Sequence, residues 1–226
     1  MKTVRVLNDI VDYIYRIIFI LIMLIGLYYI YDTVYIFYNA SGSRLFASLN
    51  KPREEIILDL TDDYVAWLTV DDTNIDYPIM QGESNSSYLN TDPYGRFSLS
   101  GSIFLDSRNA SDFSDDYSLV YGHHMANNLM FGALDEFFDK DFWSKHQSGS
   151  ITLKDGTVLD IDIFACIKTD ANNEAIFNPQ GSDVLFNSLG YGKFYKVPKN
   201  KHIVALTTCM EPGSTRRTVV LASIKD

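Results

Sequence analysis

The sequence predicts a mainly β domain, a closed barrel of seven to eight short strands, preceded by an apolar N-terminal helix. Short apolar runs separated by Gly, Asn and Asp fill the chain from residue 75 onward, a spacing typical of β-barrels and sandwiches. Aromatic residues make up 14% of the chain, which suits strands. A length of 226 residues is enough for one such domain and an appendage.

The expected elements follow from hydrophobic periodicity and turn residues. An Asp155-Gly156 turn predicts one hairpin. Apolar side chains at helical spacing predict a helix over 53–68, and two further insertions read as helical, 130–143 and 183–194. The expected strands are residues 75–80, 102–105, 118–121, 151–153, 159–168, 202–208 and 218–224.

The N-terminus predicts a membrane anchor. Residues 17–31 carry no charge, and flanking tyrosines extend this run toward the ~20 residues that span a bilayer. Lys2, Arg5 and Arg16 precede it, so the positive-inside rule places the N-terminus in the cytoplasm. A cleaved signal peptide is the alternative, although no small-x-small cleavage site is evident.

These observations predict three parts. Residues 1–37 form the cytoplasmic tip and transmembrane anchor in contact with membrane lipid, residues 38–52 a linker, and residues 53–226 an extracellular domain at the cell surface. The net charge of −10 argues against nucleic acid as a partner.

Two cysteines exclude a disulfide scaffold and a cysteine-rich zinc site. Cys166 lies in the middle of an apolar run, where a free thiol is usually a small buried hydrophobe. Cys209 instead ends the strand IVALTTC and precedes a polar loop, a placement that favours an exposed, reactive thiol. A single disulfide between the two remains an alternative.

A thiol needs a base or cation beside it to become a nucleophile. His123 and His124 follow an apolar strand and a glycine, whereas His146 and His202 lie in polar segments and are expected at the surface. Solvated loop histidines are the plainer interpretation of the first pair.

Arginine also occurs near the presumed nucleophile. Arg216 and Arg217 open the last strand, where a fixed cation can stabilise an oxyanion. Strand alternation cannot choose between the two, and a solvated strand end is the alternative.

Together these segments resemble sortases. Residues 205–209 read ALTTC, similar to the sortase motif T-L-x-T-C with alanine for the first threonine, and Arg217 follows eight residues later. YGHHM resembles the Y-G-H-N-M of class B sortases, with His124 where asparagine is common. SGSIFLDSRN and WLTVDDTNIDYPIMQ are also similar to class B segments. The resemblance covers residues 53–226.

The resemblance implies a cysteine transpeptidase with Cys209 as nucleophile, His123 as general acid and base, and Arg217 as the cation that holds the reacting carbonyl. Its substrates would be secreted proteins with a C-terminal sorting motif, and its acceptor an amine of a peptidoglycan cross-bridge or a pilin. No metal or organic cofactor is implied.

Two other functions fit the same residues. A membrane-anchored cysteine peptidase would use the same Cys/His pair with water as acceptor. A non-catalytic β-domain that binds surface ligands would keep Cys209 buried and inert.

Overall fold

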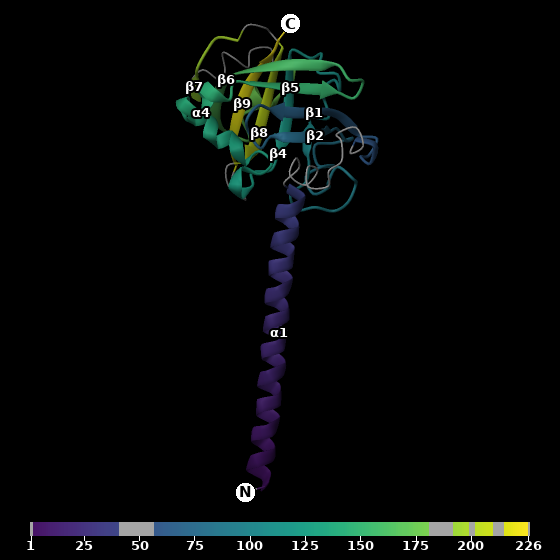
Figure 1. Cartoon of the computed structure of the whole chain (residues 1–226), viewed down its shortest axis with the longest axis vertical. Coiled ribbons are helices and arrows are strands. Elements are labelled where there is room, and N and C mark those ends of the chain that lie inside the picture. Colours follow the sequence, from purple (N-terminus) through teal and green to yellow (C-terminus); the bar gives the residue numbers. More distant parts are fainter. Residues whose placement is uncertain (1, 41–56, 181–191, 199–201, 210–214, 226) are drawn as a thin grey trace. The chain divides into compact units, whose positions relative to one another are not determined.

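The computed structural model describes residues 2–40, 57–180, 192–198, 202–209 and 215–225. The chain divides into two compact units, residues 1–38 and 39–226. Figure 1 shows a long N-terminal helix and a β-rich domain.

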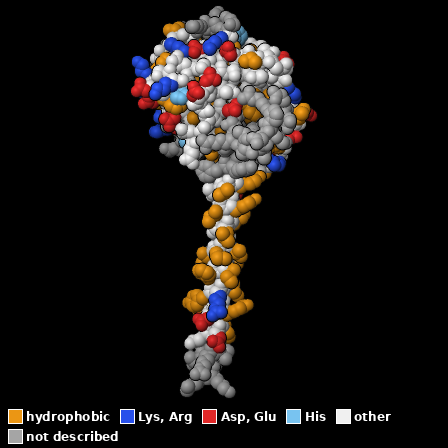
Figure 2. All heavy atoms as spheres, in the orientation of Figure 1, with side chains coloured by type: hydrophobic (Ala, Val, Ile, Leu, Met, Phe, Trp, Pro, Cys, Tyr) orange, Lys and Arg blue, Asp and Glu red, His pale blue; other side chains and the backbone are white. Residues whose placement is uncertain are grey.

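The first unit is a single helix, α1 (Lys2–Ala40). It continues past Asp32 without interruption, and within Asn8–Ile36 an 18-residue stretch has a mean hydropathy of 2.3 and is not buried. Figure 2 shows hydrophobic side chains along its described length. Such a helix is long and apolar enough to cross a bilayer, although a signal sequence would have the same properties. A core helix of a soluble fold would be mostly buried, which the apolar stretch of α1 is not within the described residues.

The second unit confirms the predicted closed β-barrel. In the described residues the sheet order is β5-β1-β2-β3-β4-β8-β9-β6-β7, and an additional β5–β6 pairing closes the ring through all strands except β7, which extends one edge of β6. The strands are β1 (Tyr64–Val70), β2 (Asp76–Met80), β3 (Ile103–Leu105), β4 (Tyr117–Gly122), β5 (Ser148–Leu153), β6 (Val158–Asp170), β7 (Gly192–Phe194), β8 (Ile203–Cys209) and β9 (Arg216–Ile224).

The hairpin between β5 and β6 is confirmed. Gly156 has φ +91°, a conformation that favours glycine, and the amide of Leu153 donates to the carbonyl of Thr157 at 2.8 Å. The Asp-Gly pair therefore sets this register.

The predicted helix over 53–68 is confirmed only in part: residues 57–58 are helical, but the C-terminal part of the prediction is wrong, because β1 occupies Tyr64–Val70. The β-branched residues Val65, Thr69 and Val70 favour a strand, and the amide of Tyr64 closes a turn onto the carbonyl of Thr61 at 3.1 Å. The strand pairs with both β2 and β5, so most of its residues are buried on either face and the alternation that marks a half-exposed strand is lost.

The insertion predicted over 130–143 is helical but divided. It contains the 3-10 helix η2 (Gly132–Phe138) and the short α4 (Lys140–Lys145), which Asp139 caps by accepting from the amides of Asp141 and Phe142. Two further short helices are η1 (Ala126–Asn128) and α5 (Glu174–Phe177).

Most of the second predicted insertion, 183–194, lies outside the described residues. Its last three residues form strand β7 rather than helix, because their backbone pairs with β6.

Alternation along the adjacent strands β4, β8 and β9 separates two layers. One face carries a cluster that α5 covers through Ile176, made of Tyr117, Leu119, Phe164, Ala165, Ile167, Ile203, Ala205, Val219 and Leu221.

On the neighbouring strand β6, Cys166 is fully buried and its Sγ lies 3.9 Å from the Leu134 carbonyl of η2. Burial raises the pKa of this thiol. Cys166 is a free cysteine, so the disulfide alternative is excluded.

Candidate active site

Strand pairing brings the three predicted catalytic positions to one edge of the barrel. In the parallel pair β4–β8, Gly122 lies beside Thr208, so His123 follows on one strand as Cys209 ends the other. In the antiparallel pair β8–β9, Cys209 is the Cα partner of Arg217. Neighbouring strands lie about 4.8 Å apart, so the three backbones are close, although the side chain of Cys209 lies outside the described part of the structure.

The same pairing distinguishes the two arginines. The partner of Arg216 on β6 is Asp170, and its side chain is exposed. Arg217 lies directly across from Cys209 and is half-buried. Residues directly opposite in a sheet share a face, so the strand register places Arg217, and not Arg216, beside Cys209.

A groove with a cavity volume of about 280 Å³ opens at this edge. Its lining comes from β3, β4, β8 and β9, from the loop after β2 and from the segment around α5. The lining residues are Asn85, Leu89, Phe104, Tyr121, Gly122, His123, Ala171, Phe177, Thr207, Thr208 and Arg217.

His123 is half-buried in this groove, and burial lowers the pKa of its imidazole from the usual value of 6.5. The ring is therefore mostly neutral at pH 7, the form that can accept a proton from a thiol. Its backbone carbonyl accepts from the amide of Phe131 at 3.0 Å, which ties the end of β4 to the segment that precedes η2.

Gly122 is required for space rather than for a turn. A Cβ there would approach Ile103 Cδ1 to 2.4 Å and the Phe131 ring to 2.7 Å, and its φ is not positive. The glycine therefore lets Phe131 pack against the end of β4 directly before His123.

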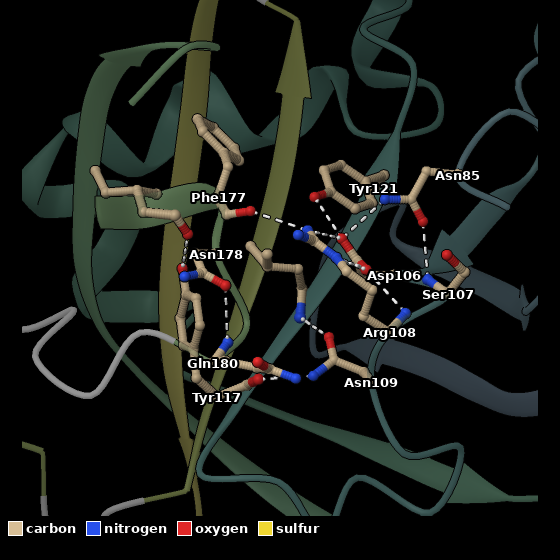
Figure 3. Close-up of polar contacts among 12 residues, drawn as sticks. Asn85, Asp106, Ser107, Arg108, Asn109, Tyr117, Tyr121, Phe177, Asn178 and Gln180 are labelled. Carbon is tan, nitrogen blue, oxygen red and sulfur yellow. Dashed lines mark hydrogen bonds and ion pairs between the residues drawn. The ribbon is translucent and has the colours of Figure 1, made fainter. Parts of the chain in front are cut away.

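The far wall of the groove is organised around one carboxylate (Figure 3). Asp106 is fully buried. It accepts from Arg108 Nε and Nη2 at 2.8 and 2.7 Å, from Asn85 Nδ2 at 2.9 Å and from the Tyr121 hydroxyl at 3.0 Å. Burial raises its pKa, but these hydrogen bonds outweigh burial and leave the pKa below the ordinary 3.8. A single anion thus orients Asn85 and Tyr121 in the groove.

Arg108 also connects this wall to the opposite side. Its Nη2 donates to the Phe177 carbonyl at 3.0 Å, a contact visible in Figure 3. Phe177 lines the groove, so the Asp106–Arg108 pair fixes segments that are far apart in sequence.

Sequence reasoning did not identify these residues as part of the site, yet both class B-like segments supply them. SGSIFLDSRN contains Asp106, Arg108 and Asn109, and DYPIMQ ends at Gln81. The Gln81 amide donates to the carbonyls of Asp106 and Asn109 at 2.9 and 2.8 Å. Buried Asn109 in turn donates to the Tyr117 carbonyl at 2.8 Å. Hydrogen bonds between these segments fix the walls of the groove, a role that cannot be predicted from any one residue type in the sequence.

One buried hydroxyl in the groove has no partner among the described residues. Thr207 is 1% exposed and its Oγ1 makes no hydrogen bond there. An unsatisfied buried hydroxyl is costly, and this oxygen has almost no exposed surface.

The other histidines lie away from the groove lining. His124 pairs with Asp135. His146 and His202, expected at the surface, are half-buried: their Nδ1 atoms lie 2.7 and 3.2 Å from the backbone carbonyls of Phe142 and Asp115. Among the described residues, no group of three or more His, Cys, Asp or Glu is arranged to hold a metal ion.

A closed β-barrel in which cysteine, histidine and arginine positions meet at the ends of three adjacent strands has the architecture of a cysteine transpeptidase. A family model described as the sortase domain matches residues 68–225. The chain therefore belongs to the sortase family.

Relatives place it among class B-like sortases. It is 29% identical to sortase B of Staphylococcus aureus over 77% of this chain and 75% of that protein. It is 35% identical to sortase B of Listeria monocytogenes over 66% of this chain and 64% of that protein. The crystal structure of a Streptococcus pyogenes class B sortase involved in pilus biogenesis superposes with a TM-score of 0.70 at 42% identity, covering 76% of this chain and 98% of that one.

The S. aureus sortase B–substrate complex has the same fold, with a TM-score of 0.67 at 27% identity over 81% of this chain and 91% of that one. These comparisons confirm the predicted family and the transpeptidase interpretation: the chain is a sortase-type cysteine transpeptidase that functions in surface-protein anchoring or pilin linking.

Proposed function

We propose that Cys209 is the nucleophile, His123 the general acid and base, and Arg217 the cation at the reacting carbonyl. The observation that carries this proposal is the register of β4, β8 and β9, which aligns Gly122 with Thr208 and Cys209 with Arg217. His123 and Arg217 also line one groove.

In the first step, the Cys209 sulfur attacks a backbone carbonyl of the sorting motif while neutral His123 takes the thiol proton. The C–S bond forms and the carbonyl oxygen becomes an oxyanion that Arg217 stabilises. The C–N bond then breaks, and the imidazolium gives its proton to the leaving amine. The product is a thioester on Cys209 and a free C-terminal fragment.

In the second step, an amine of a peptidoglycan cross-bridge or a pilin attacks the thioester. His123 takes a proton from the incoming amine, an amide bond forms, and the C–S bond breaks. The imidazolium then returns its proton to the sulfur, which restores the thiol and neutral His123. The chain's own residues supply every proton acceptor that these steps need.

The groove supports an extended peptide as donor. Tyr121 stacks on Phe104 with ring centroids 5.3 Å apart, which gives the groove a rigid apolar wall, and Asn85 provides an oriented amide. His123, Thr208 and Arg217 add polar groups to the same lining, and a peptide backbone has donors and acceptors that can pair with such groups.

The membrane arrangement is also proposed. We infer that α1 is an uncleaved anchor with its N-terminus in the cytoplasm, since Lys2, Arg5 and Arg16 lie on that side of the apolar segment. A membrane-impermeant maleimide applied to intact cells should then label Cys209 of the full-length protein, and Cys209→Ser should abolish the label. Labelling that requires lysis would contradict this orientation.

The reaction is tested with full-length protein in detergent. A library of peptides is screened for cleavage, and a cleaved peptide is then incubated with triglycine or with a peptide carrying a free lysine. Mass spectrometry should detect an acyl–amine product whose yield rises with amine concentration. Hydrolysis that no amine diverts would favour the peptidase alternative, and an uncleaved library together with an unreactive Cys209 would favour the non-catalytic one.

A further inference from the structure

His124 is directed away from the groove and toward η2. It is not part of the groove lining, and its Nε2 lies 3.1 Å from Asp135 Oδ2. Both side chains are partly buried, with exposed fractions of 26% and 35%. The residue after the proposed catalytic histidine is thus bonded to the helix that follows the loop.

Asp135 extends this contact to the strand that carries the proposed catalytic arginine. Its Oδ1 accepts from the Thr218 hydroxyl at 2.6 Å. Thr218 is fully buried on β9, directly after Arg217, and its Cα partner on β8 is Thr208. Each proposed catalytic residue therefore has an immediate chain neighbour in one connected set, His124–Asp135–Thr218–Thr208.

The loop between β4 and η2 has a backbone conformation that its surroundings must hold in place. Asn127, Asn128 and Met130 have φ values of 58°, 58° and 51°, in the left-handed region that L residues disfavour. The amide of Met130 donates to the Tyr77 hydroxyl at 2.9 Å. Strained backbone persists only where its surroundings fix it, and this loop begins directly after His123.

We propose that His124 and Asp135 are positioning residues for the transpeptidase, which hold His123 in place relative to β8 and β9 by linking the end of β4 to Thr218. The proposal rests on the catalytic roles proposed for His123 and Arg217. His124 takes no part in proton transfer to the substrate; it fixes the backbone from which His123 projects.

The expected effect is on kcat rather than on KM. A misplacement of about 1 Å can cost roughly a hundredfold in rate, whereas the peptide-binding walls around Asp106 are not part of this set. We expect His124→Ala and Asp135→Ala each to lower kcat by at least about tenfold, with KM within about twofold of wild type.

Glutamine provides the rescue. Its amide nitrogen stands the same number of bonds from Cβ as histidine Nε2, so His124→Gln can donate to Asp135 and should keep kcat within about threefold of wild type. A double variant, His124→Ala with Asp135→Ala, should be no slower than either single variant, because both changes break the same link.

His202→Ala is the matched control. His202 is another half-buried histidine with one backbone carbonyl contact, and it precedes the opposite end of β8 from Cys209. Its loss should leave kcat unchanged. Thermal melting of every variant identifies losses that come from unfolding alone.

The experiment measures kcat and KM of the detergent-solubilised full-length variants on a cleaved peptide, and the rate at which iodoacetamide alkylates Cys209 at pH 7. Low kcat and slow alkylation in His124→Ala, restored in His124→Gln, support the proposal. Full kcat in His124→Ala, additive losses in the double variant, or an equal kcat loss in His202→Ala would overturn it. Retained activity in His123→Asn would instead refute the proposed catalytic role, so the two failures are distinguishable.

Discussion

Asp106→Asn is expected to weaken both the fold and substrate binding. The substitution keeps the shape of a fully buried side chain but removes the charge that faces Arg108. It also replaces one acceptor oxygen by an NH2 group, which is itself a donor and faces the donors that bound the carboxylate. Breaking a buried ion pair costs about 3–5 kcal/mol. The Arg108 side chain is 48% exposed and stays partly hydrated, so about 2–3 kcal/mol is the reasonable figure.

That loss corresponds to a Tm decrease of about 4–12 °C for a domain of this size. Asn85 and Tyr121 lose their shared acceptor, so KM for the peptide should rise more than kcat falls. Differential scanning calorimetry and steady-state kinetics on the same preparation measure both effects.

Asp112→Asn is the control, because that carboxylate is exposed and its hydrogen bonds are local ones to Ser114 and the adjacent backbone. It should change neither Tm nor KM measurably. If Asp106→Asn melted within about 1 °C of wild type with an unchanged KM, the assignment of Asp106 as organiser of the groove would be refuted.

Three further predictions concern the proposed site and anchor. Arg217→Lys and Arg217→Ala should each lower kcat by at least about a hundredfold, with folding intact by circular dichroism. Arg216→Ala should keep kcat within about tenfold of wild type. The reverse ranking would show that Arg217 is not the arginine at the reacting carbonyl. Burial lowers the pKa of His123 below 6.5, so the unfolded chain binds more protons at this residue than the folded protein does. The free energy of unfolding is therefore highest above pH 6.5, and it decreases as pH falls through the pKa of the folded state. His123→Gln should therefore lose less Tm between pH 7 and pH 5 than wild type, and an equal loss would contradict the desolvated ring. Removal of residues 1–37 should leave a soluble, folded protein that cleaves the same peptide; a folded but inactive product would assign a catalytic part to the helix.

Much of the barrel was predictable because strand signals are local. Apolar runs and turn residues located most strands to within a few residues, and the Asp155-Gly156 turn fixed a hairpin. β1 was not predictable in the same way, since its central position buries both faces and its apolar spacing also fits a helix. The closure of the barrel depends on β5–β6 pairing, which no local pattern encodes.

The site was predictable only in part, for the same reason. Cys209, His123 and Arg217 stand at strand ends, and such positions can be read from the sequence. The resemblance to sortases chose Arg217 over Arg216, and the β8–β9 register, which pairs Arg217 with Cys209, supports that proposal. Asp106 and Asp135 act through partners that are distant in the chain, so only the fold reveals them.

The central claim, that Cys209 forms the acyl-enzyme, is tested most directly by trapping the intermediate. Full-length protein is mixed with a cleaved peptide, quenched in acid within the first turnovers, digested and analysed by mass spectrometry. The peptide that contains Cys209 should carry the mass of the acyl fragment, Cys166→Ala should give the same adduct, and Cys209→Ala should give none. An adduct on Cys166, or continued turnover by Cys209→Ala, would contradict the mechanism.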